Sequence, residues 1–131
     1  MNLLFVCKHN RFRSKVAEEL FNFYDGGKNE AKSAGIFLDP INQYVAENVY
    51  FVLGERGLRI KNEKARVVDR EMIDWADKII VVANDVDLEL FPREKTEVWR
   101  IGDADEADLI RIKKIIDEID DNVKKLLNIE L

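Results

Sequence analysis

Hydrophobic and polar positions along the chain follow two patterns, which predict alternating strands and helices. Short continuous apolar runs predict buried strands at residues 3–7 and 79–82, and residues 30–33 and 97–99 are expected to form the second and fourth strands. Apolar residues spaced three and four apart predict helices at residues 16–24, 41–53, 72–76 and 109–127. Glycines at 26–27 and 57 are expected to end the first two helices, and Ala34-Gly35 to stop the second strand.

This order of elements favours a three-layer α/β/α fold. We expect a four-stranded parallel sheet in strand order 2-1-3-4 with helices on both faces, in one domain spanning residues 1–131. In such sheets ligands bind at the carboxyl ends of the strands, near a switch in strand order. Cys7 ends the first predicted strand and Asp103 follows the last one. Both side chains are therefore expected on the same rim of the sheet.

The amino-acid composition limits the classes of protein to which this chain can belong. The 131 residues are 47% hydrophobic, which is ordinary for a folded domain. The formal net charge of −5 argues against a general nucleic-acid binder, since such proteins are usually basic. Cys7 is the only cysteine, which excludes an internal disulfide and a multi-cysteine zinc site.

No targeting or membrane segment is expected. The apolar run at the start of the chain, residues 3–6, is too short for the core of a signal peptide. No stretch approaches the ~18 apolar residues of a membrane span. We therefore expect a cytoplasmic protein.

The segment from residue 7 to 14 carries the candidate chemistry. Cys7 is followed six residues later by Arg13 and then Ser14, between a predicted strand and a predicted helix. Loop N–H groups, the positive end of the helix and the planar guanidinium of Arg13 all favour a bound phosphate. The same surroundings favour Cys7 as a thiolate, placed for in-line attack on phosphorus. The alternative is an inert buried thiol beside a surface arginine, which this strand–loop–helix context disfavours.

This segment resembles the Cys-x5-Arg-Ser signature of the low-molecular-weight protein tyrosine phosphatase family, which includes the thioredoxin-type arsenate reductases. Shorter resemblances follow in the family's order, at Asn10, Gly57 and segments 33–35, 65–66, 76–80 and 99–103. Of these, Ser33-Ala34-Gly35 follows the second strand, and Trp99-x-Ile101-x-Asp103 carries the family's general acid. The matches span about residues 2–127.

The resemblance implies a phosphomonoesterase that needs no metal or cofactor. Cys7 would form a phosphocysteine, Arg13 would bind the phosphoryl oxygens, and Asp103 would act as general acid and then as base. Ser33 and Asn10 would support a phosphate-binding loop that also comprises Lys8, His9, Arg11, Phe12 and Ser14. The partner would be a phosphorylated protein or a small phosphate ester, with no nucleic acid or membrane involved.

The chain departs from the family's pattern within this loop. His9 stands where the family has glycine, so a left-handed backbone is conceivable there. Phe12 replaces a second cysteine found in many members. Arg11 lies at the expected pocket mouth, where it either favours acidic substrates or is simply solvated.

A second departure from the family's pattern concerns the residue expected to act as general acid. Asp103 is followed by alanine instead of proline, and Asp105 competes for the role. Either aspartate is also a favourable cap for the terminal helix. Phe37 and Leu38 are candidates for an apolar pocket wall.

Two other functions remain open. One is arsenate reduction with an external thiol, since Cys7 has no partner cysteine in the chain. The other is a non-enzymatic phosphate-binding module, against which the pairing of Arg13 with a candidate acid argues. The sequence leaves the oligomeric state open, and phosphotyrosine, phosphoarginine and small esters all remain possible substrates.

Overall fold

The sheet contains the four predicted strands in the predicted order. The structure, a computed structural model, describes residues 1–129. Its strands are β1 (Asn2–Cys7), β2 (Glu30–Gly35), β3 (Lys78–Val82) and β4 (Thr96–Trp99). All pair in parallel, in the order β2-β1-β3-β4, which confirms the predicted topology. The strand order switches direction between β1 and β3, so a crevice is expected where these two strands end.

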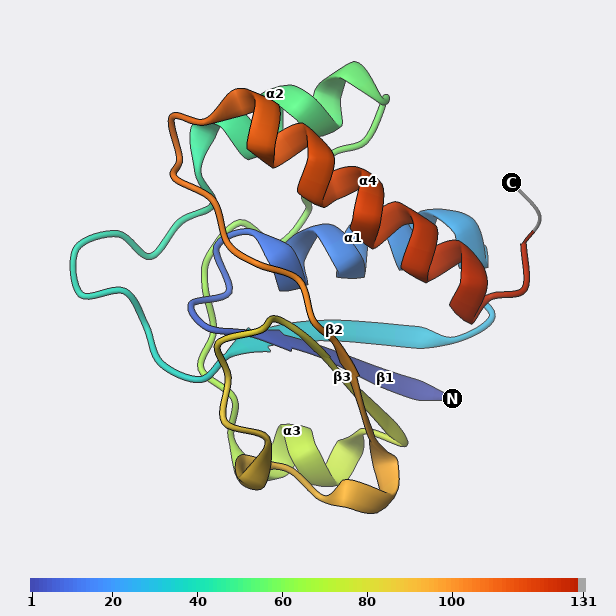
Figure 1. Cartoon of the computed structure of the whole chain (residues 1–131). Helices are drawn as coiled ribbons and strands as arrows, with labels where there is room; N and C mark the ends of the chain where they lie inside the picture. The colour runs from blue at the N-terminus through green and yellow to red at the C-terminus, as the bar shows by residue number, and fades with distance from the viewer. Residues whose placement is uncertain (130–131) are drawn as a thin grey trace.

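Helices cover both faces of the sheet, as predicted (Figure 1). On one face lie α1 (Arg13–Asp25), α2 (Glu47–Glu55) and α4 (Leu109–Leu126). On the other face lies α3 (Arg70–Trp75), where the 3-10 helix η1 (Leu88–Leu90) also packs. A second 3-10 turn, η2 (Arg93–Lys95), leads into β4. The loops that follow β1, β2 and β4 gather at the same end of the sheet (Figure 1).

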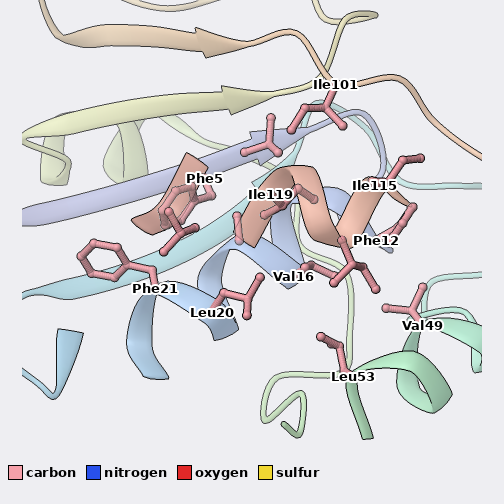
Figure 2. Packing of buried hydrophobic residues seen from close by; sticks show 14 of the residues in the cluster. Phe5, Phe12, Val16, Leu20, Phe21, Val49, Leu53, Ile101, Ile115 and Ile119 are labelled. Atoms are coloured by element: carbon pink, nitrogen blue, oxygen red, sulfur yellow. The ribbon is translucent and has the colours of Figure 1, made fainter. Parts of the chain in front are cut away.

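The central strand β1 divides two hydrophobic clusters. Its side chains alternate, so Phe5 joins the cluster under α1 and α4 while Leu4 joins the one under α3. In the larger cluster the rings of Phe5 and Phe21 lie 5.8 Å apart. Figure 2 shows Phe5, Val16 and Ile119 converging between β1, α1 and α4. Burial on both sides holds β1 rigid, and with it Cys7 at its end.

The second helix is shorter than predicted. It begins at Glu47, whereas the apolar spacing predicted residue 41, and Ile41 is 95% exposed. The carboxylate of Asp39 instead accepts hydrogen bonds from the backbone N–H groups of Ile41 and Asn42. Such local bonds compete with helix formation and keep this stretch as a loop.

Two smaller boundaries also differ. Strand β2 continues to Gly35, because Ala34 and Gly35 still pair with the last two residues of β1. Helix α4 is capped by Asp108, whose side chain accepts from Arg111 N, so neither aspartate suggested by the sequence caps it. No helix within residues 1–129 combines the length and apolar character needed to cross a bilayer.

Candidate active site

The thiol of Cys7 lies where β1 passes into the β1–α1 loop, residues 8–12. The residue is 3% exposed, and its Sγ lies 3.0 Å from Ser14 Oγ in the first turn of α1. Because α1 begins at Arg13, the positive end of its dipole faces this loop. The local structure therefore places a sulfur, a hydroxyl and a helix N-terminus together.

The loop also offers backbone donors. Within residues 1–129, the N–H groups of residues 9–14 have no hydrogen-bond acceptor, although Phe12 O accepts from Val16 N. Consecutive free N–H groups before a helix are the usual receptor for a tetrahedral anion.

Asn10 fixes the shape of this loop. Its backbone is left-handed, with φ of 56°, so the strained position is Asn10 and not His9 as the sequence suggested. Its amide nitrogen donates to Ser14 Oγ at 2.8 Å and to Ser33 Oγ at 3.0 Å. Its amide oxygen accepts from Arg66 N at 3.0 Å, which settles the amide's orientation. Asn10 thus connects the β1–α1 loop to α1, to Ser33 of β2 and to the backbone of Arg66.

These hydrogen bonds determine to which atom each serine hydroxyl group donates its proton. Ser33 Oγ donates to Glu18 Oε1 at 2.5 Å, so it accepts from Asn10. Ser14 Oγ likewise accepts from Asn10, which leaves its own proton free for Cys7 Sγ. A hydroxyl that donates to sulfur stabilises the thiolate form.

Close packing behind the loop requires Gly35. A Cβ added there would lie 2.8 Å from Asn10 N and from His9 C, and 2.9 Å from Lys8 O. Lys8 O in turn accepts from Ile36 N at 3.0 Å, just past the end of β2. The β1–α1 loop is therefore pressed directly onto the end of β2.

Arg13 is buried and anchored by two partners. It is 2% exposed, and its Nη1 donates to Ile101 O at 2.8 Å. Its Nη2 donates to Asp85 Oδ1 at 3.0 Å. These partners fix the plane of the guanidinium, which lines the same pocket as Cys7.

Asp103 reaches this site from the loop between β4 and α4. Its Oδ2 lies 3.8 Å from Arg13 Nη2, and it lines the pocket with Cys7. Asp105 does not line the pocket, and its carboxylate accepts from Ala107 N in a turn. Of the two aspartates, Asp103 is therefore the one that shares the pocket with Cys7 and Arg13.

The pocket joins polar groups to an apolar wall. The wall consists of Phe12, Ala46, Val49, Ala104 and Ile112. Phe37 does not contribute, because its ring packs edge-on against His9 with centroids 4.8 Å apart. The apolar wall predicted at residues 37–38 is therefore replaced by one from α2, α4 and the loops that precede α1, α2 and α4. The ammonium of Lys8 lies 5.9 Å from the Phe37 ring, and Lys8 is outside the pocket lining.

Arg11 is paired within the protein. Its Nη1 pairs with Glu106 and lies 3.9 Å from Asp39, while its Nε donates to Tyr44 O at 2.8 Å. Hydrogen bonds from the backbone N–H groups of residues 41 and 42 lower the pKa of Asp39, which keeps it charged beside Arg11. Arg11 thus ties three loops together at the pocket mouth and lines the pocket, and within residues 1–129 its buried Nη2 has no hydrogen-bond partner.

Sequence reasoning missed Asp85 and Glu18. Asp85 follows β3 at the same edge of the sheet, so the rule used for Asp103 was enough to find it. Glu18 lies on the buried face of α1, only 8% exposed, and a carboxylate in an apolar helix stripe signals a specific partner. Within residues 1–129, no three His, Cys, Asp or Glu side chains are arranged to hold a metal ion.

Comparison with known proteins identifies relatives over nearly the whole chain. The family model for low molecular weight phosphotyrosine protein phosphatases matches residues 2–130. Arsenate reductase 1 of Bacillus cereus (strain ATCC 10987 / NRS 248) is 29% identical over 126 residues, covering 94% of this chain and 91% of the relative.

Two solved structures are similar in fold. The low molecular weight protein tyrosine phosphatase from T. tengcongensis is 27% identical with a TM-score of 0.84, covering 98% of each chain. The arsenate reductase from Archaeoglobus fulgidus DSM 4304 is 32% identical with a TM-score of 0.79, covering 96% of this chain and 98% of that one.

Proposed function

The chain belongs to the low molecular weight phosphotyrosine protein phosphatase family, and from this premise we propose that residues 1–131 form one phosphatase domain. In it, Cys7 attacks the phosphorus of a phosphate monoester and forms a phosphocysteine. Arg13 holds the phosphoryl oxygens, and Asp103 protonates the leaving oxygen. The observation that carries this proposal is the convergence of these three side chains on one pocket.

The first step is supported by the surroundings of the sulfur. The free N–H groups of residues 9–14 and the N-terminus of α1 provide positive potential for a phosphate. Ser14 Oγ at 3.0 Å stabilises the Cys7 thiolate before attack. As the S–P bond forms and the ester P–O bond breaks, negative charge develops on the oxygens next to Arg13. This electrostatic support comes from the chain itself, so the proposed reaction uses no cofactor.

Asp103 then serves twice. In its protonated form it gives a proton to the departing oxygen, which would otherwise leave as an unstable alkoxide or phenoxide. The resulting carboxylate accepts a proton from the water that attacks phosphocysteine, which restores the Cys7 thiolate and releases phosphate. Its position beside Arg13, with the side chain half exposed at the mouth, supports this role.

The substrate would be a phosphorylated protein or a small phosphate ester. The pocket combines an apolar wall with carboxylates at its mouth, which accommodates the organic part of such a molecule. The net charge of −5 argues against nucleic acid. A free nucleophilic thiol also fits the reducing cytoplasm better than an oxidising compartment.

The second candidate is arsenate reduction, which the names of the arsenate reductase relatives favour. Cys7 would attack arsenic, and an external thiol would then attack the Cys7 sulfur, releasing arsenite with both electrons. A second external thiol would reduce the resulting mixed disulfide. A relay of cysteines within this chain is impossible, because Cys7 is its only cysteine. This absence makes hydrolysis the better supported of the two reactions.

The test is steady-state hydrolysis of p-nitrophenyl phosphate by the wild type and Cys7→Ser, with and without EDTA. The proposal expects turnover that EDTA leaves unchanged and that Cys7→Ser abolishes, while vanadate still binds the variant. Turnover by the variant near the wild-type rate would remove Cys7 from the mechanism. No turnover by the wild type, with arsenite formed from arsenate and glutathione, would favour the reductase.

A further inference from the structure

Lys15 is a buried cation in a place that two general rules disfavour. Its side chain is 1% exposed, and it lies in the first turn of α1. A positive charge is unfavourable at a helix N-terminus, and burying an ammonium is costly. Violations of this kind are expected where function requires the residue.

The ammonium has one clear partner. Lys15 Nζ donates to Lys64 O at 3.0 Å. Within residues 1–129 no carboxylate lies at ion-pair distance from it, and the carboxylate of Glu18, one turn along α1, accepts from Ser33 instead. The charge of Lys15 is therefore not neutralised at short range.

The partner of Lys15 belongs to the segment that holds the β1–α1 loop. In this segment, residues 61–66, Arg66 N donates to Asn10 Oδ1 at 3.0 Å. Arg66 O accepts from Gly35 N at 2.7 Å. Asn10 in turn sets the Ser14 hydroxyl that points to Cys7. Through its hydrogen bond to Lys64 O, Lys15 thus holds the segment whose Arg66 N binds Asn10 in the network that orients the thiol.

The charges around Lys15 include the thiol itself. Burial lowers the pKa of Lys15 from 10.5 to about 8; Glu18 and Glu19 on α1 oppose this shift, as does Cys7, while Arg66 adds to it. The ammonium is therefore still present at neutral pH. The electrostatic coupling between two charges is reciprocal. A negative charge at Cys7 favours the ammonium form of Lys15, so the ammonium of Lys15 in turn favours the thiolate form of Cys7.

We propose that Lys15 is a positioning residue for the Cys7 nucleophile, although it does not line the pocket. Its ammonium holds residues 61–66 against the back of the β1–α1 loop and supplies positive potential to the sulfur. The inference rests on the proposed thiolate chemistry, but the thiolate can be measured without any turnover.

The first test is the rate at which iodoacetamide alkylates Cys7 at mildly acidic pH. We expect Lys15→Met to react about three- to tenfold more slowly, because loss of one nearby charge lowers the thiolate fraction. Lys15→Arg keeps the charge and is expected within about twofold of wild type. Lys28→Met, an exposed lysine in the turn after α1, is the matched control and should not change the rate. Equal rates for Lys15→Met and Lys28→Met, or equal slowing by both Lys15 variants, would overturn the proposal.

A second measurement needs no variant. The Lys15 side chain is titrated by carbon NMR in the wild type, before and after alkylation of Cys7. Removal of the thiolate is expected to lower the midpoint of the Lys15 titration. An unchanged midpoint would contradict the proposal even if both Lys15 variants failed to fold. Failure of p-nitrophenyl phosphate hydrolysis would instead remove the proposed phosphatase while leaving both measurements intact.

Discussion

Asp103 Oδ2 lies 3.8 Å from Arg13 Nη2, although one residue follows β4 and the other begins α1. In the proposed mechanism this distance lets both side chains reach the same phosphoryl group, Arg13 at the equatorial oxygens and Asp103 at the leaving oxygen. Arg13 has little freedom to move, because Ile101 O and Asp85 hold its guanidinium. Asp103 is half exposed and lines the pocket beside Arg13.

The proposed role of Asp103 as general acid predicts that the rate of hydrolysis depends on the leaving group. Asp103→Asn is expected to slow hydrolysis of phenyl phosphate by about a hundredfold, because phenoxide needs a proton to leave. The loss with p-nitrophenyl phosphate should be smaller, since nitrophenolate is stable without one. The measurement is kcat for both substrates. Asp105→Asn is the control, since its carboxylate accepts from Ala107 N and does not line the pocket, and the opposite pattern in the two variants would reassign the acid.

The pairing of Arg13 with Asp85 predicts a loss of stability. Asp85→Ala leaves the buried guanidinium with its hydrogen bond to Ile101 O and with the more distant, half-exposed carboxylate of Asp103. The expected decrease in the free energy of unfolding is about 1–3 kcal/mol, since an underpaired buried charge is costly. Urea denaturation measures it. Vanadate, which replaces the lost negative charge, should restore more stability to the variant than to the wild type, and an equal gain in both would contradict this explanation.

The close approach of the β1–α1 loop to Gly35 predicts a second loss of stability. Gly35→Ala places a Cβ 2.8 Å from the backbone of residues 9 and 10, which the loop can only relieve by shifting. We expect a loss of about 1–3 kcal/mol in the free energy of unfolding, together with slower hydrolysis. Gly54→Ala in α2 has open space around its Cβ. It should leave hydrolysis unchanged and raise stability by about 0.5–1 kcal/mol, so similar effects at both glycines would show that packing at Gly35 is unimportant.

The lowered pKa of Lys15 predicts a pH dependence of stability. The folded protein releases this proton near pH 8, whereas the unfolded chain keeps it until about 10.5. Between these values the unfolded state binds more protons, so this residue makes the free energy of unfolding rise with pH. Lys15→Met lacks that contribution. Urea denaturation should therefore show the stability of wild type rising relative to the variant from pH 8 upward, and a constant difference would rule out the buried ammonium.

The sequence carried most information where function depends on neighbours in the chain. Cys7, Arg13 and Ser14 lie on one loop and helix turn, so their spacing was enough to predict that they meet. Topology predicted that Asp103 lies on the same rim as Cys7, because parallel strands end at one edge, whereas its role as acid came from the family resemblance. Strands β1 and β3 followed from apolar runs that the sheet buries on both faces.

The features that the sequence did not predict correctly depend on side chains that meet across the fold. Glu18 binds Ser33, and Arg11 pairs with Glu106, through contacts that no local pattern encodes. The helix predicted from residue 41 had the correct apolar spacing, but Asp39 captures the backbone there. Periodicity measures which face is apolar, and it does not register competition from a neighbouring carboxylate.

The central claim is that Cys7 becomes phosphorylated during turnover, and acid quenching tests it most directly. The enzyme is mixed with p-nitrophenyl phosphate, quenched within one turnover, digested and examined by mass spectrometry. Asp103→Asn is included because slower attack by water should accumulate the intermediate, and Cys7→Ala because alanine cannot accept the group. The account predicts one phosphoryl group on the Cys7 peptide, more of it in Asp103→Asn and none in Cys7→Ala. Continued turnover with no phosphoryl group on Cys7 in either active protein, or with the group on another residue, would contradict it.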